Sequence, residues 1–350
     1  MRSAEVPPLP APRGPVSEAV LDALRREPGP LRHPSLRALR DSDLLDDDDA
    51  QLALACCYEL HYRSFAGVDD GWEWQPDLLA LRGGIEARFV RRLEQEVGSP
   101  ADMSAGAALS ALRALAGGDS AGPSLSQFME QRGTRENMRE FCVHRSAYQL
   151  KEADPHTWMI PRLVGRAKAA AVTIQYDEYG EGSVAAMHSE LFADTMRVLG
   201  LDPTYGAYLD LLPATTLATG NLVTMFGLHR RWRAACVGHL ALFEMTSVVP
   251  MGRYAAALRR LAPERVARRF YDVHVVADAE HEQIAQRDLV SGFLESEPSA
   301  GGTVVFGARA LVEVERRMAS ALLDAWRDGR SSLLHPLTSG LVSSSVARAF

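Results

Sequence analysis

Two histidines and one aspartate in the C-terminal third of the chain have a spacing that suits a metal site on a helix. They occur as His274-x3-Asp278-x2-His281. At 3.6 residues per turn, offsets of 0, 4 and 7 residues place the three side chains within about 60° of one helix face. Imidazole and carboxylate together suit divalent iron, manganese or zinc. The pattern therefore predicts part of a metal site, although a helix with two unrelated surface histidines would share this spacing.

Three glutamates could supply further ligands. Glu244 lies in the apolar stretch Leu240-Ala-Leu-Phe-Glu244-Met, where an ionised carboxylate is costly unless it is paired or bound to metal. Glu152 lies near an expected helix end before Pro155. Its alternative interpretation is a solvated carboxylate beside Lys151. Glu178 is the third candidate, and it lies directly before a glycine-rich segment.

Two glycines come soon after Glu178, at Gly180 and Gly182. An unbroken helix would place Glu178 and His188, which is ten residues further on, roughly 80° apart. Glycines in such a cluster favour an interruption of the helix. We therefore expect an irregular segment after Glu178 that brings Glu178 and His188 into one site.

The absence of known motifs disfavours two alternative metal sites. No Glu-x-x-His occurs, which argues against the di-iron site of ferritin-like bundles. His-Glu-x-x-His is also absent, so a thermolysin-type zinc protease is disfavoured. His156, His229 and His239 have no partner at ligand spacing, so we expect structural or supporting roles for them.

The composition restricts the partners and the compartment. The net charge is −7 and the hydrophobic fraction is 47%, which is typical of a globular domain and favours no nucleic-acid or membrane partner. We find no run of about 18 apolar residues and expect no membrane span. The four cysteines form no CxxC pair, so we expect a reducing, cytoplasmic location.

Ala, Leu, Arg and Glu dominate after the N-terminus, and alternating β-branched runs are scarce, so we predict an all-α fold. The Pro-rich start predicts a disordered tail over 1–16. A helical arm over 17–98 and a main bundle over 99–330 come next, and 331–350 form a C-terminal tail. The expected helices are 17–27, 35–43, 48–65, 75–97, 104–117, 124–153, 160–178, 184–199, 205–217, 221–247, 251–261, 264–295 and 305–328.

The block Asp177-Glu-Tyr-Gly-Glu-Gly-Ser-Val-Ala-Ala-Met-His-Ser-Glu-Leu-Phe192, together with His274-x3-Asp278-x2-His281, resembles a known family. This family is the iron-containing redox enzymes with a heme-oxygenase-like fold, also called heme-oxygenase-like di-iron oxidases, which bind no heme. The resemblance implies a heme-oxygenase-like helical bundle with an N-terminal helical arm that serves a homodimer. The metal ligands that it implies are Glu152, Glu178, His188, Glu244, His274, Asp278 and His281.

The resemblance also implies the chemistry. Two Fe(II) ions would react with O2 through a peroxo-di-iron(III) species, with electrons from an external donor. Members that N-oxygenate their substrates have an additional carboxylate ligand, which Glu178 matches, so we predict Glu178 as the catalytic residue. The first hypothesis is therefore N-oxygenation of an amine or guanidine in a small, amino-acid-like substrate. The alternatives are oxidative C–C cleavage, decarboxylation or desaturation of a small carboxylate, and a non-catalytic iron-binding protein. Manganese in place of one iron stays open.

Overall fold

A computed structural model describes residues 6–31, 36–39, 43–118 and 124–337, and throughout these ranges the chain forms helices and turns without strands. The predicted all-α class is confirmed. The helices of the arm are α1 (Pro15–Leu24), α2 (Asp48–Glu59) and α3 (Pro76–Val97). The helices of the bundle are α4 (Ala105–Gly117), α5 (Leu125–Gln131), α6 (Arg135–Gln149), α7 (Asp154–Thr157), α8 (Gly165–Glu178), α9 (His188–Val198), α10 (Ala214–Leu228), α11 (Arg233–Leu261), α12 (Arg265–Ile284), α13 (Ser291–Ser296) and α14 (Gly301–Arg327).

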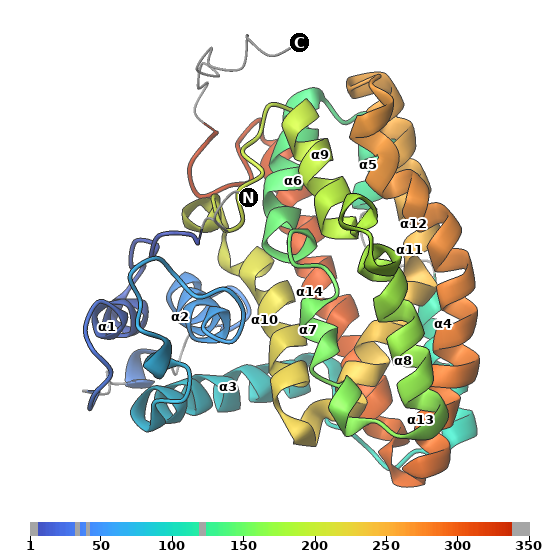
Figure 1. The fold of residues 1–350 in the computed structure, drawn as a ribbon, viewed down its shortest axis with the longest axis horizontal. Helices are drawn as coiled ribbons and strands as arrows, with labels where there is room; N and C mark the ends of the chain where they lie inside the picture. The colour runs from blue at the N-terminus through green and yellow to red at the C-terminus, as the bar shows by residue number, and fades with distance from the viewer. Residues whose placement is uncertain (1–5, 32–35, 40–42, 119–123, 338–350) are drawn as a thin grey trace.

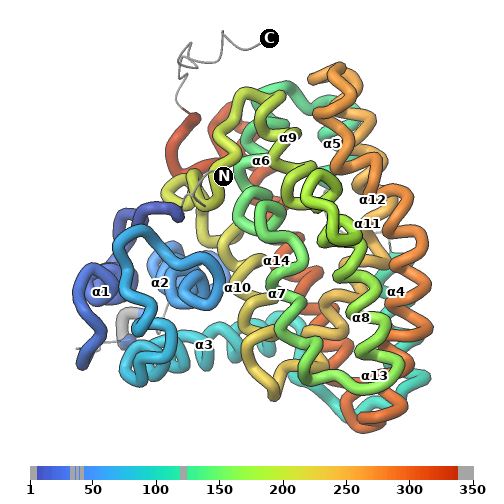
Figure 2. The backbone as a smooth tube through the Cα atoms, in the orientation of Figure 1, coloured from blue at the N-terminus to red at the C-terminus, as the bar shows by residue number. Residues whose placement is uncertain are grey.

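The arm lies on one side of the bundle, and α10 lies between them (Figure 1). The tube in Figure 2 shows the same division and shows α3 extending from the arm along the base of the bundle. Within the bundle, α11 packs lengthwise against both α12 and α14, whereas α9 and α8 cover α12 on its other sides. This arrangement places α12, with its predicted ligands, between α11 and α8.

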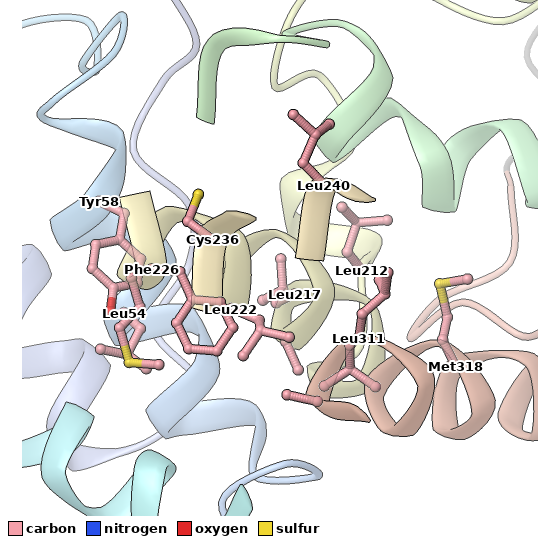
Figure 3. Packing of buried hydrophobic residues seen from close by; sticks show 14 of the residues in the cluster. Leu54, Tyr58, Leu212, Leu217, Leu222, Phe226, Cys236, Leu240, Leu311 and Met318 are labelled. Atoms are coloured by element: carbon pink, nitrogen blue, oxygen red, sulfur yellow. The ribbon is translucent and has the colours of Figure 1, made fainter. Parts of the chain in front are cut away.

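A continuous apolar core joins the arm to the bundle. Leu54 and Tyr58 of α2 face Leu222 and Phe226 of α10, and Cys236 of α11 lies beside them (Figure 3). Burial of apolar area stabilises by about 25 cal/mol per Å², so a shared core ties the two parts energetically. The prediction of separate units at 17–98 and 99–330 stays a prediction. All four cysteines are buried and free.

The segment Arg230–Leu261, which contains α11, is long and apolar enough to cross a membrane, contrary to our expectation from the sequence. About two thirds of its most apolar window, 67%, is buried inside the protein. A core helix needs an apolar surface on every side that it packs, so it has the same composition as a membrane span. The prediction that the chain has no membrane partner stays a prediction.

Several predicted helix boundaries are wrong. The predicted break at Pro250 is absent, since α11 runs through this residue; packing of α11 on both sides of Pro250 outweighs the roughly 3 kcal/mol cost of proline in a helix. The predicted helix 124–153 is interrupted where Thr134 caps α6 through its side chain. The predicted helix 205–217 is mostly irregular, because Pro213 ends that segment and precedes the start of α10. His229 and Trp232 flank an interruption of the predicted helix 221–247.

The predicted N-terminal tail is ordered over residues 6–16. The Pro7 carbonyl accepts a hydrogen bond from the Ala66 amide at 2.9 Å. The Arg13 guanidinium donates to the carbonyls of Leu209 and Leu212 at 2.8 and 2.6 Å. The proline-rich segment is therefore extended, as composition suggests, but it is held by these bonds; residues 1–5 lie outside the described residues. Of the predicted C-terminal tail, residues 331–337 are described and 338–350 are not.

Candidate metal centre

The structure brings all seven predicted ligand side chains into one buried region of the bundle, each at most 7% exposed. They come from four helices and one turn. The turn lies between α6 and α7 and carries the first of them. The others lie at the end of α8, at the start of α9, in the middle of α11 and along one face of α12. In chain order they are Glu152, Glu178, His188, Glu244, His274, Asp278 and His281.

The helix break predicted after Glu178 is present. Gly180 and Gly182 have φ values of 64° and 82°, and Glu181 between them has 54°. A Cβ at Gly180 would clash with the Met187 amide nitrogen, so only glycine fits there. The chain thus reverses tightly, and His188 Nδ1 comes within 2.6 Å of Glu178 Oε2.

The potential ligand atoms form two groups that share one carboxylate. Glu152, His188 and His274 make one group with Glu178, and Glu244, Asp278 and His281 make the other with Glu178. Within each group the ligand atoms all lie within 4.8 Å of one another. Glu178 therefore lies between the two groups, a division that the sequence alone did not provide.

The hydrogen bonds of two histidines fix which nitrogen each presents to its group. His274 Nδ1 donates to the Phe270 carbonyl at 2.8 Å, so its Nε2 faces Glu152 at 3.8 Å. His281 Nε2 donates to Asp177 Oδ2 at 3.0 Å, so its Nδ1 faces Glu244 Oε2 at 3.3 Å. Metal-binding histidines usually donate their other N–H to a carbonyl or carboxylate in this way. Both imidazoles are thus oriented as ligands would be.

Unpartnered polar atoms gather in these groups. A buried polar atom without a hydrogen bond costs free energy, and in native proteins such atoms are few. Two carboxylate oxygens therefore point into the site without a partner, as oxygens that face a cation would. The unpartnered atoms are Glu152 Oε2 and Asp278 Oδ2, whereas His188 Nδ1 faces Glu178 Oε2 at 2.6 Å and His281 Nδ1 faces Glu244 Oε2 at 3.3 Å.

Crowding of charge changes the protonation of these groups. Burial, together with Glu244 and Glu178, raises the pKa of Asp278 to about 9. Burial also raises the pKa of Glu152 well above its ordinary value, and the neighbouring carboxylates add to this. Burial alone would raise the pKa of Glu178, but the surrounding imidazoles outweigh it and hold the pKa at about 2. Without a cation, part of this carboxylate cluster therefore holds protons at neutral pH.

A small cavity of about 10 Å³, room for about one water molecule, opens beside the carboxylates. Tyr148, His156 and Phe243 form part of its wall. His156 Nε2 lies 3.0 Å from His239 Nδ1, and both rings are buried. Burial lowers the pKa of His239 to about 3, so this pair is neutral. His156 thus lines the cavity beside the site, and the supporting role expected for it stays a prediction.

The sequence model that describes the family of iron-containing redox enzymes matches residues 139–316 of this chain, just over half of its length. The chain belongs to this family. Membership assigns it to redox enzymes that contain iron, and its all-α bundle has the heme-oxygenase-like fold. All seven converging side chains lie within the matched range. The buried carboxylate and histidine groups fit iron binding, because these donors suit divalent iron.

A nitrosourea synthase from Streptomyces achromogenes subsp. streptozoticus is a more specific relative. It is 24% identical to this chain over 147 residues, which is 42% of this chain. The aligned segment spans 31% of that synthase, so about two thirds of the relative has no counterpart in the match. The similarity concerns a part of that enzyme, and its whole activity does not transfer with it.

Sequence reasoning missed two features of the centre. Asp177 accepts the outer N–H of His281, and the Phe270 carbonyl accepts that of His274. Phe270 precedes His274 by one helical turn, so this bond is a consequence of the helix itself. Asp177 lies 104 residues before His281, and only the packing of α8 on α12 reveals the pair.

Proposed function

We propose that this protein is a non-heme di-iron oxygenase that N-oxygenates an amine or guanidine of a small, amino-acid-like substrate with O2. The observation that supports it best is the convergence of seven buried ligand side chains in two groups that share Glu178. The groups with Glu152 and with Glu244 would each hold one iron. Bound there, the ferrous pair would supply the electrons that activate O2.

The charges of the cluster support two divalent ions. Its four carboxylates carry a charge of −4 when ionised, and imidazoles that bind a metal ion are neutral and add no charge. Two Fe(II) ions cancel this charge, whereas with a single ion two of the carboxylates would have to be neutralised by protons instead. Uncompensated buried charge is strongly unfavourable. Glu178, whose pKa is held at about 2 by the surrounding imidazoles despite its burial, is ionised and suited to lie between two cations.

The wall of the cavity favours a nitrogen group over a carboxylate at the end of the substrate that enters it. The described side chains that line the cavity include neither Lys nor Arg, which a carboxylate bound inside it would need as a counter-charge. Tyr148 and Phe243 instead contribute aromatic rings to the wall, and the faces of such rings attract cationic nitrogen groups. Since the cavity holds about one water molecule, these side chains must move apart for a substrate to enter.

The reaction requires an external reductant. An amine R–NH2, O2, two electrons and two protons give R–NHOH and water, so one oxygen atom enters the N–H bond and the other leaves as water. We infer that a separate donor must supply these two electrons. We further propose that the protein acts in the cytoplasm on a small molecule, with no nucleic-acid or membrane partner.

The test starts with anaerobic loading of the protein with Fe(II), and metal analysis and exposure to O2 come next. Two irons per chain and a transient visible absorption are the expected results. A protein that binds iron but shows no reaction with O2 would be a non-catalytic iron-binding protein. Product masses from a panel of amines and guanidines then decide the reaction: a gain of one oxygen on nitrogen supports the proposal.

Loss of a carbon fragment alone, with no product that has gained oxygen on nitrogen, would instead indicate oxidative C–C cleavage or decarboxylation. Glu178→Ala provides the matched variant, because the proposal assigns this carboxylate to both ions. Full activity of Glu178→Ala would contradict N-oxygenation by this site.

A further inference from the structure

Glu152 is the ligand candidate whose backbone is least supported by a helix. It lies in the turn after α6, and the next residue, Ala153, has φ 75° and ψ −37°. Positive φ is unfavourable for residues with a Cβ, and this region is close to the strained γ-turn. Such a conformation persists only when its surroundings impose it. The orientation of the Glu152 carboxylate therefore depends on the contacts that fix the backbone of residues 150–153.

On one side, the bundle holds this turn through α8. Gln175 Nε2 donates to the Ala153 carbonyl at 2.7 Å and to Thr157 Oγ1 at 2.6 Å. Gln175 is buried and precedes Glu178 by one turn of the same helix. This contact fixes the end of the turn relative to the carboxylate that both ligand groups share.

On the other side, the arm holds the turn through Lys151. Lys151 Nζ lies 3.0 Å from Glu59 Oε2, and the two side chains are only 11% and 10% exposed. The ammonium also lies 4.1 Å from the centre of the Tyr62 ring, a cation–π contact. Glu59 Oε2 additionally accepts a hydrogen bond from Tyr205 at 2.6 Å. A buried ion pair with this many partners has a defined geometry, unlike a surface pair.

Lys151 and Glu152 are neighbours whose side chains reach different parts of the protein. Lys151 reaches α2 of the arm, whereas Glu152 approaches His274 in the bundle. A second contact from the arm reinforces this, because Arg63 donates to the Leu150 carbonyl at 3.3 Å. The arm therefore contacts the two residues that directly precede Glu152.

We propose that the Glu59–Lys151 ion pair is a positioning element that holds the Glu152 carboxylate in its ligand group, which makes the N-terminal arm part of the framework of the metal centre. This inference rests on the proposed function, since it presumes that the group of Glu152, His188 and His274 holds an ion. The ion pair does not touch that ion. It fixes the backbone from which one ligand projects, as outer residues do at many metal sites.

The test is an anaerobic titration with Fe(II), repeated with Co(II) as a spectroscopic probe, on the full chain and on Lys151→Met. Lys151→Met keeps most of the length of the side chain and removes its charge. We expect one of the two ions to bind about tenfold to a hundredfold more weakly, while the other ion retains its affinity. Amide exchange over residues 150–153 should accelerate in the same variant.

Arg317→Met is the matched control. Arg317 in α14 also pairs with the arm, at 2.9 Å from Asp43 and 2.7 Å from Asp46, but it contacts neither Glu152 nor its turn. The Arg317→Met variant should have a lower melting temperature and an unchanged affinity for both ions. A general loosening of the arm would affect both variants alike, whereas a positioning role affects Lys151→Met alone.

Lys151→Arg should rescue binding because it retains the cation, and Glu59→Gln should reproduce the loss without truncating a side chain. Glu59→Gln also gives the same comparison if Lys151→Met does not fold. Wild-type affinity for both ions in Lys151→Met or Glu59→Gln would overturn the inference, as would an equal loss in Arg317→Met. Failure of the wild-type protein to bind two ions would overturn the proposed function together with this inference.

Discussion

Asp177 and Glu178 are neighbours in α8 that face opposite nitrogens of one imidazole. Asp177 Oδ2 lies 3.0 Å from His281 Nε2, and Glu178 Oε1 lies 3.8 Å from His281 Nδ1. The outer carboxylate therefore selects the tautomer that leaves Nδ1 available beside the shared carboxylate. Such a carboxylate also makes the imidazole a more basic ligand.

Asp177→Ala should lower the affinity for the ion that His281 binds about tenfold to a hundredfold, because the imidazole loses both its orientation and its polarising partner. Anaerobic titration with Fe(II) measures the effect. Asp194→Asn, which changes a partly exposed carboxylate in α9 that pairs with Arg197, is the control and should bind both ions normally. Unchanged iron affinity in Asp177→Ala would show that the hydrogen bond does not affect binding.

The two ligand groups predict that different single variants lose different ions. His188→Ala should remove the ion that it shares with Glu152, and His281→Ala should remove the ion that it shares with Glu244. Glu178→Ala should lower the affinity for both ions, since the Glu178 carboxylate belongs to both groups. Metal analysis and Mössbauer spectra of the loaded variants would distinguish these cases.

His144→Asn is the control for loss of a buried histidine. His144 bonds to Thr216 at 2.6 Å and to Ser332 at 3.0 Å, and it belongs to neither ligand group. It should retain two ions. The division into two groups would be refuted if His188→Ala and His281→Ala lost the same ion.

The pKa values of the centre predict how pH affects the stability of the metal-free protein. Burial and the neighbouring Glu244 and Glu178 raise the pKa of Asp278 from 3.8 to about 9. Burial lowers the pKa of His281, but Glu244 and Asp177 outweigh this and raise it from 6.5 to about 10. A group whose pKa is higher in the folded state stabilises the fold below its unfolded pKa and loses that contribution as pH rises toward the folded pKa.

Both groups therefore lose stabilising free energy in the metal-free protein as pH rises from 6.5 to 9. The melting temperature of this form should fall across that window. Iron displaces both protons, so the loaded protein should show a smaller fall, and its iron affinity should increase with pH. Calorimetry of both forms provides the measurement; a flat melting temperature for the metal-free form would contradict the assigned pKa shifts.

Metal should also order α12. Without cations, four carboxylates and three imidazoles share one buried region, and like charges there repel. We expect residues 270–285 to open more readily in the metal-free protein, because separation of the helix relieves this repulsion. Amide exchange with and without Fe(II) tests this, with α14 as the internal reference. Identical protection of residues 270–285 in both states would argue against coupling between metal binding and local folding.

The sequence alone determined the features that depend on local geometry. The spacing of His274, Asp278 and His281 placed three ligands on one helix face, because helical periodicity is fixed by the backbone. Gly180 and Gly182 marked the end of α8, since positive φ favours glycine. Local context also singled out Glu152, Glu178, His188 and Glu244 as candidates, resemblance to a family implied that all seven are ligands, and composition was sufficient for the all-α class.

Only the tertiary structure decided the relations between residues far apart in the chain. It divided the ligands around Glu178, gave Asp177 its role toward His281, and joined Lys151 to Glu59 of the arm. The tertiary structure also keeps α11 helical at Pro250, because packing outweighs the unfavourable helix propensity of proline. Such contacts depend on how helices pack, and packing is set by the summed surfaces of all the elements, which no local pattern in the sequence specifies.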